Sequence, residues 1–388
     1  MKRLFWALAA ALMMFVPAAL AQTAQEITDT CTLSAVGKKT LGRMTDGQYQ
    51  TYWASSSGSY AYVEIEAEES VGGLYVQFYE DIAALEVQTT DDAGAWRTVA
   101  VSGGSFLNEY IALDAGTETV RIRPKDGKGR LFIAELHVFG EGDAPDWVQQ
   151  WEAPLDKADL LALAAHPDDE LLFLGGTIPY YAGEMGRKVQ VAYLVPTMPY
   201  RRLELLDGLW LCGVKNYPMI GHFPDKYQLT LKGMYAQKGW SRESVYRFVA
   251  ETYRACRPDV VVTQDVNGEY GHGAHRAAAD AAQAAIALAA DENDQEKMTH
   301  SEPWQVKKLY LHLYEQNPVK MDWRKPLAAF GGQTAFDLAS RAFECHISQQ
   351  RTDYHVEDFG PYDNSKFGLA YSAVGEDVQK DDFFENLE

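Results

Sequence analysis

Two patterns of apolar and polar positions divide the chain. Between residues 26 and 140, short segments alternate apolar and polar residues and are separated by Gly, Asp and Ser. The clearest of these segments are Tyr60–Glu66, Gly73–Phe78, Ala84–Gln88, Thr119–Arg123 and Arg130–Phe139. A period of two predicts half-buried strands, and short strands at regular spacing favour an antiparallel sandwich. We therefore expect an all-β sandwich over residues 26–140.

After residue 158 the apolar residues form short continuous runs instead. Such runs are typical of strands that a parallel sheet buries on both faces, and they cover Leu160–Ala165, Lys188–Val195, Asp259–Thr263 and Lys307–His312. Helical patterns separate or follow them at Thr177–Gly186, Tyr200–Cys212, Ser241–Cys256, Arg276–Ala290 and Thr334–Gln350. Strands joined by helices predict right-handed βαβ units. Residues 158–350 should therefore form an α/β domain with a Rossmann-like, mostly parallel sheet and flanking helices.

Three further segments complete the predicted organisation. Residues 1–21 have the charged start, apolar core and Ala19-Leu20-Ala21 cleavage pattern of a secretory signal peptide, which predicts a secreted, extracellular protein. Residues 141–157 are polar, contain Gly and Pro, and predict a linker. Residues 351–388 are a C-terminal extension that we expect to pack on the α/β domain, as a lid or over a sheet edge. No later stretch approaches the roughly 18 to 20 apolar residues of a membrane span, so we expect none.

Composition narrows the range of partners. The chain has 388 residues and a formal net charge of −20. A surface this acidic repels phosphate backbones, so we expect no nucleic-acid partner. The four cysteines are scattered, without a CxxC pair, and Cys212 and Cys256 lie in apolar helical contexts typical of buried thiols. The sequence therefore predicts no cysteine ligand for a metal.

Two polar clusters follow two of the predicted strands. His166, Asp168 and Asp169 come directly after the first apolar run, where Pro167 ends the strand, and Asn267–His275 follows the third run. Folds of the α/β class place their ligands at the carboxyl edge of the sheet. One histidine from each cluster and one aspartate make a His/Asp/His set, and three protein ligands with an open position are the arrangement of a catalytic zinc. The helix dipole also favours acidic residues in a first helical turn, but it gives no reason for His166.

The two clusters together resemble the PIG-L/LmbE-like zinc de-N-acetylases, which remove acetyl groups from N-acetylglucosaminyl substrates. The motifs that carry the resemblance are Ala165-His166-Pro167-Asp168-Asp169-Glu170 and Tyr270-Gly271-His272-x-x-His275, within a similarity from about Leu160 to Gln350. By motif position, the resemblance implies that His166, Asp169 and His275 hold Zn²⁺. It also implies that Asp168 is the general base and that His272 and Tyr270 stabilise the oxyanion.

The resemblance also bears on residues outside these motifs. The family has an Asp between its two second-motif histidines, and here His272-Gly273-Ala274-His275 lacks it, so its supporting role must be filled otherwise or is absent. Arg201, in an Arg-x-x-Glu pattern with Glu204, and Asp225 match substrate-binding positions. An ordinary surface ion pair is the alternative for Arg201. His346 matches the late helix of the family, and we interpret it as a packed helical histidine rather than an outer donor.

The segment from residue 26 to 140 has its own resemblance, to discoidin-type, galactose-binding-like jelly rolls. It rests on Thr51-Tyr52-Trp53, Trp96, Val120-Arg121-Ile122 and Glu135-Leu136-His137-Val138. Such modules often bind glycans, so a glycan ligand on the sandwich is one expectation and a purely structural attachment is the other. Trp53 and Trp96 could stack on a sugar, but lone aromatics in β-proteins are more often core residues, and we interpret them so.

The expected function is that of a secreted, zinc-dependent amidohydrolase. It would remove the N-acetyl group from N-acetylglucosamine-type sugars with Asp168 as base and with His272 as an imidazolium, yielding acetate and a free amine. One alternative is a carbohydrate-binding protein with an inactive deacetylase-like domain. A zinc peptidase is another, although the chain has no HExxH motif. Iron is an alternative to zinc in the same ligand set.

Overall fold

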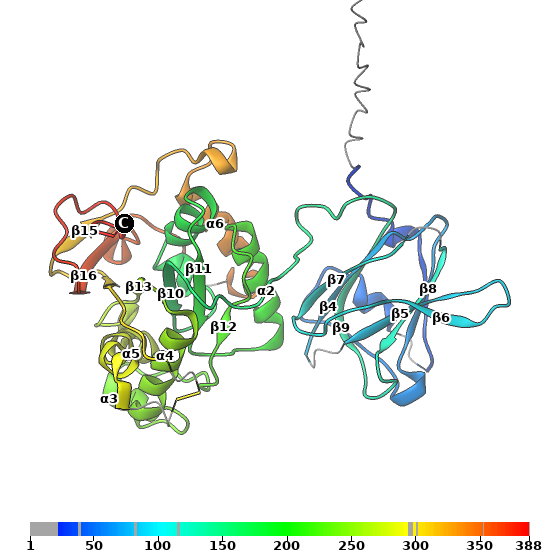
Figure 1. The fold of residues 1–388 in the computed structure, drawn as a ribbon, viewed down its shortest axis with the longest axis horizontal. Coiled ribbons are helices and arrows are strands. Elements are labelled where there is room, and N and C mark those ends of the chain that lie inside the picture. The colour runs from blue at the N-terminus through cyan, green and yellow to red at the C-terminus, as the bar shows by residue number, and fades with distance from the viewer. Residues whose placement is uncertain are drawn as a thin grey trace, which may run out of the picture.

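The computed structural model describes residues 22–37, 40–80, 84–114, 117–293, 298–299, 302–351 and 353–387. The expected signal peptide, residues 1–21, lies outside these residues. Figure 1 shows a β-rich region, coloured blue to cyan, and an α/β region, coloured green to red. Within the described ranges, no helix combines the length and the apolar character that crossing a bilayer requires.

The β-rich region, here called the sandwich, consists of two antiparallel sheets. The strand orders are β1-β3-β8-β5-β6 and β2-β9-β4-β7. The strands are β1 (Thr32–Ser34), β2 (Trp53–Ala54), β3 (Val63–Glu66), β4 (Gly73–Phe78), β5 (Leu85–Thr90), β6 (Trp96–Val101), β7 (Asn108–Ala112), β8 (Thr119–Pro124) and β9 (Phe132–Phe139). Alternate residues such as Val63 and Ile65 are fully buried in the core between the sheets. The predicted antiparallel sandwich is confirmed.

Four strands of the sandwich were not predicted from the sequence pattern. β1 and β2 have three and two residues, and most of β6 is exposed, so none shows a clear alternation. β7 begins with the buried polar residues Asn108 and Glu109. Trp53 is fully buried, which confirms it as a core residue. Trp96 is half-buried, and the Arg121 guanidinium lies 3.9 Å from its ring centroid.

The α/β region contains a seven-stranded sheet in the order β12-β11-β10-β13-β14-β16-β15. The strands are β10 (Leu160–Ala164), β11 (Val189–Tyr193), β12 (Met219–Ile220), β13 (Val260–Thr263), β14 (Lys308–His312), β15 (Pro318–Lys320) and β16 (Lys366–Ser372). The first five in this order pair in parallel and the last two pair antiparallel. The predicted Rossmann-like, mostly parallel sheet is confirmed.

Helices cover both faces of this sheet. They are α1 (Asp169–Leu172), α2 (Pro199–Leu211), α3 (Leu231–Tyr235), α4 (Arg242–Cys256), α5 (Gly273–Ala290) and α6 (Ala335–Glu344). Leu160 of β10 belongs to the buried cluster that includes α2 and α6, whereas its neighbour Leu161 belongs to the cluster that includes α4 and α5. Burial on both faces explains the continuous apolar runs in the sequence.

Three predicted helices have different limits or geometry. α5 begins at Gly273 instead of Arg276, because the His272 side chain accepts a hydrogen bond from the Ala274 N–H and caps the helix. α6 ends at Glu344, six residues before the predicted end, and a 3₁₀ turn, Ile347–Gln349, follows it. Residues Pro179–Glu184 form a π-helix within the predicted helical segment.

The C-terminal extension contributes a strand to the sheet. β16 pairs with both β14 and β15, and Phe383 and Phe384 are buried. The ammonium group of Lys308 in β14 lies 2.5 Å from the Asp377 carboxylate, and both side chains are fully buried. The extension was expected to form a lid or to cover a sheet edge. By pairing with β14, β16 covers the edge of the parallel part of the sheet.

The sandwich and the α/β region are in direct contact. The Asp207 carboxylate on α2 accepts hydrogen bonds from the Tyr49 hydroxyl at 2.8 Å and from the Gln149 amide at 2.5 Å. Trp151 packs edge-on against Trp210, with ring centroids 5.4 Å apart. Figure 1 shows α2 on the side of the α/β region that faces the sandwich. Gln149 and Trp151 belong to the predicted linker. The Asn108 amide of β7 also donates to Gln149 Oε1 at 2.5 Å, so the linker contacts both regions.

Candidate functional site

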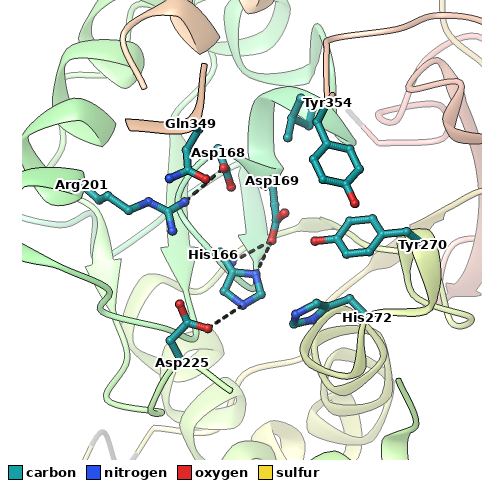
Figure 2. Close-up of a pocket in the computed structure, with 10 residues that line it drawn as sticks. His166, Asp168, Asp169, Arg201, Asp225, Tyr270, His272, Gln349 and Tyr354 are labelled. Carbon is teal, nitrogen blue, oxygen red and sulfur yellow. Dashed lines mark hydrogen bonds and ion pairs between the residues drawn. The ribbon is translucent and has the colours of Figure 1, made fainter. Parts of the chain in front are cut away.

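The two polar clusters meet at the carboxyl edge of the parallel sheet. β10 and β13 are parallel neighbours, with Leu163 opposite Thr263, so the segments that follow them emerge side by side. They line a cavity of about 170 Å³ (Figure 2). The residues around this cavity are His166, Asp168, Asp169, Leu172, Arg201, Asp225, Tyr270, His272, Gln349 and Tyr354. His275, the remaining candidate ligand, is fully buried.

The turn after β10 carries an unfavourable backbone conformation. Asp168 has φ = 113°, a region that residues other than glycine rarely adopt. Its N–H donates to the Glu170 carboxylate at 2.9 Å, and its carbonyl accepts from the N–H groups of Leu171 and Leu172. Strain held in place by such contacts is a feature of functional sites, because it orients side chains that an ordinary turn would not. Here it directs Asp168 and Asp169 together into the cavity.

The three predicted ligands share one contact atom. Oδ2 of Asp169 lies 3.1 Å from Nδ1 of His166 and 3.3 Å from Nε2 of His275. It also accepts the His166 N–H at 2.8 Å. His272 is close as well, since the donor atoms of His166, His272 and His275 lie within 4.8 Å of one another. His166 and His275 belong to both possible sets, and the third member is either Asp169 or His272.

The partner of each Nδ1 atom distinguishes the two second-motif histidines. Nδ1 of His272 accepts the Ala274 N–H at 3.1 Å, so in the neutral ring the proton is on Nε2, which becomes a donor. Nδ1 of His275 lies 2.8 Å from the Glu269 carboxylate, so its proton is on Nδ1 and Nε2 keeps a free lone pair. His275 is therefore suited to a metal and His272 to an oxyanion, which favours Asp169 as the third ligand.

Glu269 supports both His275 and a histidine from the next strand. Its other carboxylate oxygen lies 2.6 Å from Nδ1 of His312, whose Nε2 is 3.2 Å from the Asp363 carbonyl. Glu269 and His312 are fully buried. Glu269 thus contacts His275 from outside the interval between His272 and His275, in which the expected Asp is missing. Sequence reasoning missed both residues, although Glu269 lies inside the second cluster and His312 ends a strand beside β13.

Electrostatics at the ligand set favour a bound cation. Burial opposes charge on Asp169, but His275 and His166 outweigh it and lower its pKa. Burial likewise opposes charge on His275, but Asp169 and Glu269 raise its pKa. Hydrogen bonds from His275 and His312 overcome burial and lower the pKa of Glu269 to about 2. The carboxylates thus favour a positive charge at this point of the buried pocket, and a set of two imidazoles and one carboxylate is of the kind that binds zinc.

Asp168 differs from its neighbour Asp169. Burial raises the pKa of Asp168 to about 7, against the Arg201 guanidinium, which lies 3.1 Å away and lowers it. The same Arg201 Nη2 donates to the Pro167 carbonyl at 2.6 Å. A carboxyl group with this pKa can both accept and release a proton near neutral pH.

The surroundings of His272 favour its neutral form over the expected imidazolium. Burial and the adjacent imidazoles of His166 and His275 lower its pKa to about 3. Its Nε2–H remains available as a neutral hydrogen-bond donor. Tyr270 lies beside it with φ = 45°, and its hydroxyl is 3.4 Å from Nε2 of His275.

The two predicted substrate-binding residues both line the cavity. Arg201 is held by its contacts with the first motif, and Asp225 is more exposed, with Oδ1 3.9 Å from Nε2 of His166. The suggested Arg201–Glu204 surface pair is wrong, because Glu204 is fully buried and accepts from the N–H and hydroxyl of Ser348.

The segment that follows α6 contributes two cavity-lining residues that neither of the two motifs predicted. Gln349 and Tyr354 line the cavity, and the Tyr354 ring lies 4.9 Å from that of Tyr270. His346 is fully buried, 3.7 Å from Glu170, and does not line the cavity.

Solved structures resemble separate parts of the chain. N,N'-diacetylchitobiose deacetylase from Pyrococcus horikoshii is 18% identical, covering 53% of this chain and 75% of its own, with a TM-score of 0.36. An F5/8 type C domain from Bacteroides fragilis is 14% identical, covering 31% of this chain and 96% of its own, with a TM-score of 0.25.

Two curated relatives match part of the chain in sequence. Each is named 1D-myo-inositol 2-acetamido-2-deoxy-alpha-D-glucopyranoside deacetylase. The protein from Kineococcus radiotolerans is 29% identical over 50% of this chain and 65% of its own length. That from Streptomyces avermitilis is 32% identical over 39% of this chain and 60% of its own. This chain thus spans less than two thirds of either relative. The family model PIG-L, described as GlcNAc-PI de-N-acetylase, matches residues 161–286 of this chain.

Proposed function

We propose that this protein is a metal-dependent amidohydrolase that removes the N-acetyl group from N-acetylglucosamine-type sugars. The observation that carries the proposal is the contact of Asp169 Oδ2 with both His166 and His275, directly beside Asp168, whose pKa is about 7. The match to the PIG-L family model and the deacetylase names of the curated relatives support the same reaction.

His166, Asp169 and His275 would hold the metal, for which zinc is our proposal. When bound, zinc supplies a Lewis acid that polarises the amide carbonyl and lowers the pKa of water. Asp168 accepts the proton of the attacking water, since its carboxylate faces the cavity and Arg201 keeps it in place. Its pKa also allows it to release that proton later in the reaction.

The remaining groups act on the amide itself. The Nε2–H of His272 donates to the carbonyl oxygen as negative charge develops there, and the Tyr270 hydroxyl is placed to assist. As the C–N bond breaks, Asp168 returns its proton to the leaving nitrogen. The second proton of the water passes from the acetic acid to the amine, so the products are acetate and the ammonium form of the amino sugar, and protons balance without a further acid.

The site of action is also part of the proposal. The pattern of residues 1–21 supports export, and an exported enzyme would meet extracellular glycans or cell-wall sugars. Comparing the mature N-terminus and the location of the full-length protein with those of a variant lacking residues 2–21 tests this step. Retention of residues 1–21 on an intracellular protein would contradict export.

An acetate-release screen tests the reaction. The substrates would be N-acetylglucosamine, its β-linked oligomers and peptidoglycan fragments, each with and without a chelator. We expect acetate release that the chelator abolishes and added zinc restores. Stoichiometric zinc without acetate release from any of these substrates would contradict the proposal and favour a carbohydrate-binding protein with an inactive domain.

A further inference from the structure

A second cavity, of about 770 Å³, lies between the sandwich and the C-terminal half of α2. We propose that it binds a neutral saccharide, at a site separate from the metal-ligand cluster. Its sandwich wall is formed by Tyr75 and Gln77 of β4 and by His137 of β9. Their neighbours Leu74, Val76 and Leu136 belong to the sandwich core, so strand alternation turns these three side chains outward.

Aromatic rings form the apolar part of this cavity. Trp147 is 46% exposed although it is a large apolar residue. Its ring packs edge-on against Tyr75 at 5.9 Å and against His137 at 5.0 Å, so its position is fixed from one side. Trp210 of α2 also lines the cavity. A rigid, partly exposed indole offers the C–H face of a sugar ring an apolar surface.

Two polar groups of this cavity could bind a sugar: one lacks a partner and the other keeps acceptor capacity. Tyr75 is 1% exposed, and its hydroxyl makes no hydrogen bond of ordinary geometry with any described residue, although Asn108 and Gln149 are nearby. Buried hydroxyls are normally satisfied, so this one calls for a ligand group. The Asp207 carboxylate accepts from Tyr49 and Gln149 and retains acceptor capacity for a sugar hydroxyl.

Charge indicates a neutral ligand. Asp146 and Asp207 accompany Lys215 in the lining, and the ammonium of Lys215 lies 3.2 Å from the Trp210 ring centroid. This local balance, on a chain of net charge −20, gives an anionic glycan no advantage. A mostly apolar cavity with a few fixed polar groups and a volume of several hundred Å³ is suited to a small saccharide.

The cavity cannot present a sugar to the metal-ligand cluster directly. Arg201 lies in the first turn of α2, whereas Asp207 and Trp210 lie about 9 and 14 Å further along it, at 1.5 Å per residue. The N-terminal end of α2 adjoins the carboxyl edge of the sheet, and its C-terminal end adjoins the sandwich. A saccharide bound here is therefore held and not hydrolysed, and its binding does not depend on the proposed reaction.

Calorimetric titration of the full-length protein with galactose, N-acetylglucosamine and their β-linked oligomers tests the proposal. Trp147→Ala should weaken binding of the saccharide that saturates this site at least about tenfold, and Tyr75→Phe about fivefold. Tyr60→Ala is the matched control, because Tyr60 is a sandwich residue with 60% exposure outside the cavity. We expect it to bind as the wild type does.

Two results would overturn the proposal. One is unchanged binding in both Trp147→Ala and Tyr75→Phe, which would assign any observed saccharide to another site. The other is a wild-type protein that none of these saccharides saturates. Acetate release from N-acetylglucosamine is measured in parallel, and loss of binding with unchanged acetate release in Trp147→Ala would support a separate site. A failed deacetylase assay would leave the binding result intact.

Discussion

At the scale of single residues, two aspartates and two histidines of the site differ in their properties because their surroundings differ. Asp168 and Asp169 are adjacent, yet the pKa of one is raised to about 7 and that of the other is lowered. His272 and His275 are three residues apart, yet their Nδ1 atoms face a donor and a carboxylate respectively. In the proposed function, each pair therefore divides metal binding from proton transfer or hydrogen bonding.

Replacing Asp168 should separate these two tasks. Asp168→Asn keeps the shape of the side chain but removes the proton acceptor, so acetate release should fall about 10²- to 10⁴-fold. Zinc content, measured by elemental analysis, should stay at the wild-type level because Asp169 keeps its contacts with His166 and His275. Asp92→Asn, in an exposed turn of the sandwich, is the control. Full activity of Asp168→Asn would exclude Asp168 as the base.

Replacing Glu269 should weaken metal binding. Glu269→Gln removes the carboxylate that fixes the proton of His275 on Nδ1, so zinc affinity should fall about 10- to 100-fold. Competition with a chromogenic chelator measures this change. Glu243→Gln is the matched control, because the Glu243 side chain is 86% exposed. Equal zinc affinity in Glu269→Gln and wild type would show that His275 does not depend on this contact.

The sequence predicted the three candidate ligands because each of them follows a strand of the parallel sheet. His166 and Asp169 follow β10 directly, and His275 follows β13 closely, so adjacent parallel strands determine where they lie. Gln349 and Tyr354 follow no strand. Gln349 follows Ser348, which donates two hydrogen bonds to Glu204 of the distant helix α2, and no local pattern encodes that contact.

At the scale of elements, helix ends and sheet edges depended on contacts distant in sequence. α5 begins three residues before its predicted start because His272 caps it. α6 ends before its predicted end, and the following segment is bound through Ser348 to Glu204. The apolar runs predicted the central parallel strands, since burial on both faces leaves a local signal. β16 has no such signal, because its pairing with β14 joins segments that are far apart in the sequence.

The buried pair of Lys308 and Asp377 should make the C-terminal extension essential for stability. Asp377→Ala leaves the Lys308 ammonium buried without its charge partner, so we expect a loss of about 3–5 kcal/mol in the free energy of unfolding. Urea unfolding followed by tryptophan fluorescence measures it. The double variant Lys308→Met, Asp377→Leu should recover much of the loss. A change below about 1 kcal/mol in Asp377→Ala would contradict this role.

At the scale of the whole molecule, both folds were predictable but their docking was not. Each region has its own periodicity, whereas the contacts of Tyr49 and Gln149 with Asp207 join single polar residues. Residues 141–157 are polar enough to predict a linker, yet Val148 and Trp151 are buried in the packed structure. Sparse polar contacts of this kind leave no pattern in the sequence.

The contact between the regions should respond to pH. Burial raises the pKa of Asp207 to about 6, although hydrogen bonds from Tyr49 and Gln149 oppose the shift. The folded protein therefore binds a proton more tightly than an unfolded chain, whose Asp pKa is about 3.9. The resulting stabilisation is fully present below about pH 4 and is lost as the pH rises through 6.

Chemical denaturation between pH 4 and pH 8 checks this expectation. The wild type should lose stability with rising pH more steeply than Asp207→Asn, which has no carboxyl group to titrate at this position. Asp92→Asn should follow the wild-type slope. Identical slopes for wild type and Asp207→Asn would show that Asp207 does not contribute to the pH dependence.

The place of β16 in the sheet has a consequence for how the polypeptide reaches its native state. β14 pairs on one side with β13 and on the other with β16, which ends at residue 372. A ribosome that has not yet translated this segment holds a nascent chain whose β14 has an unpaired edge, a surface prone to association with other strands. The α/β region can therefore complete this sheet only after residues 366–372 have left the ribosome, and chaperone protection would be needed most between the synthesis of β14 and that of β16.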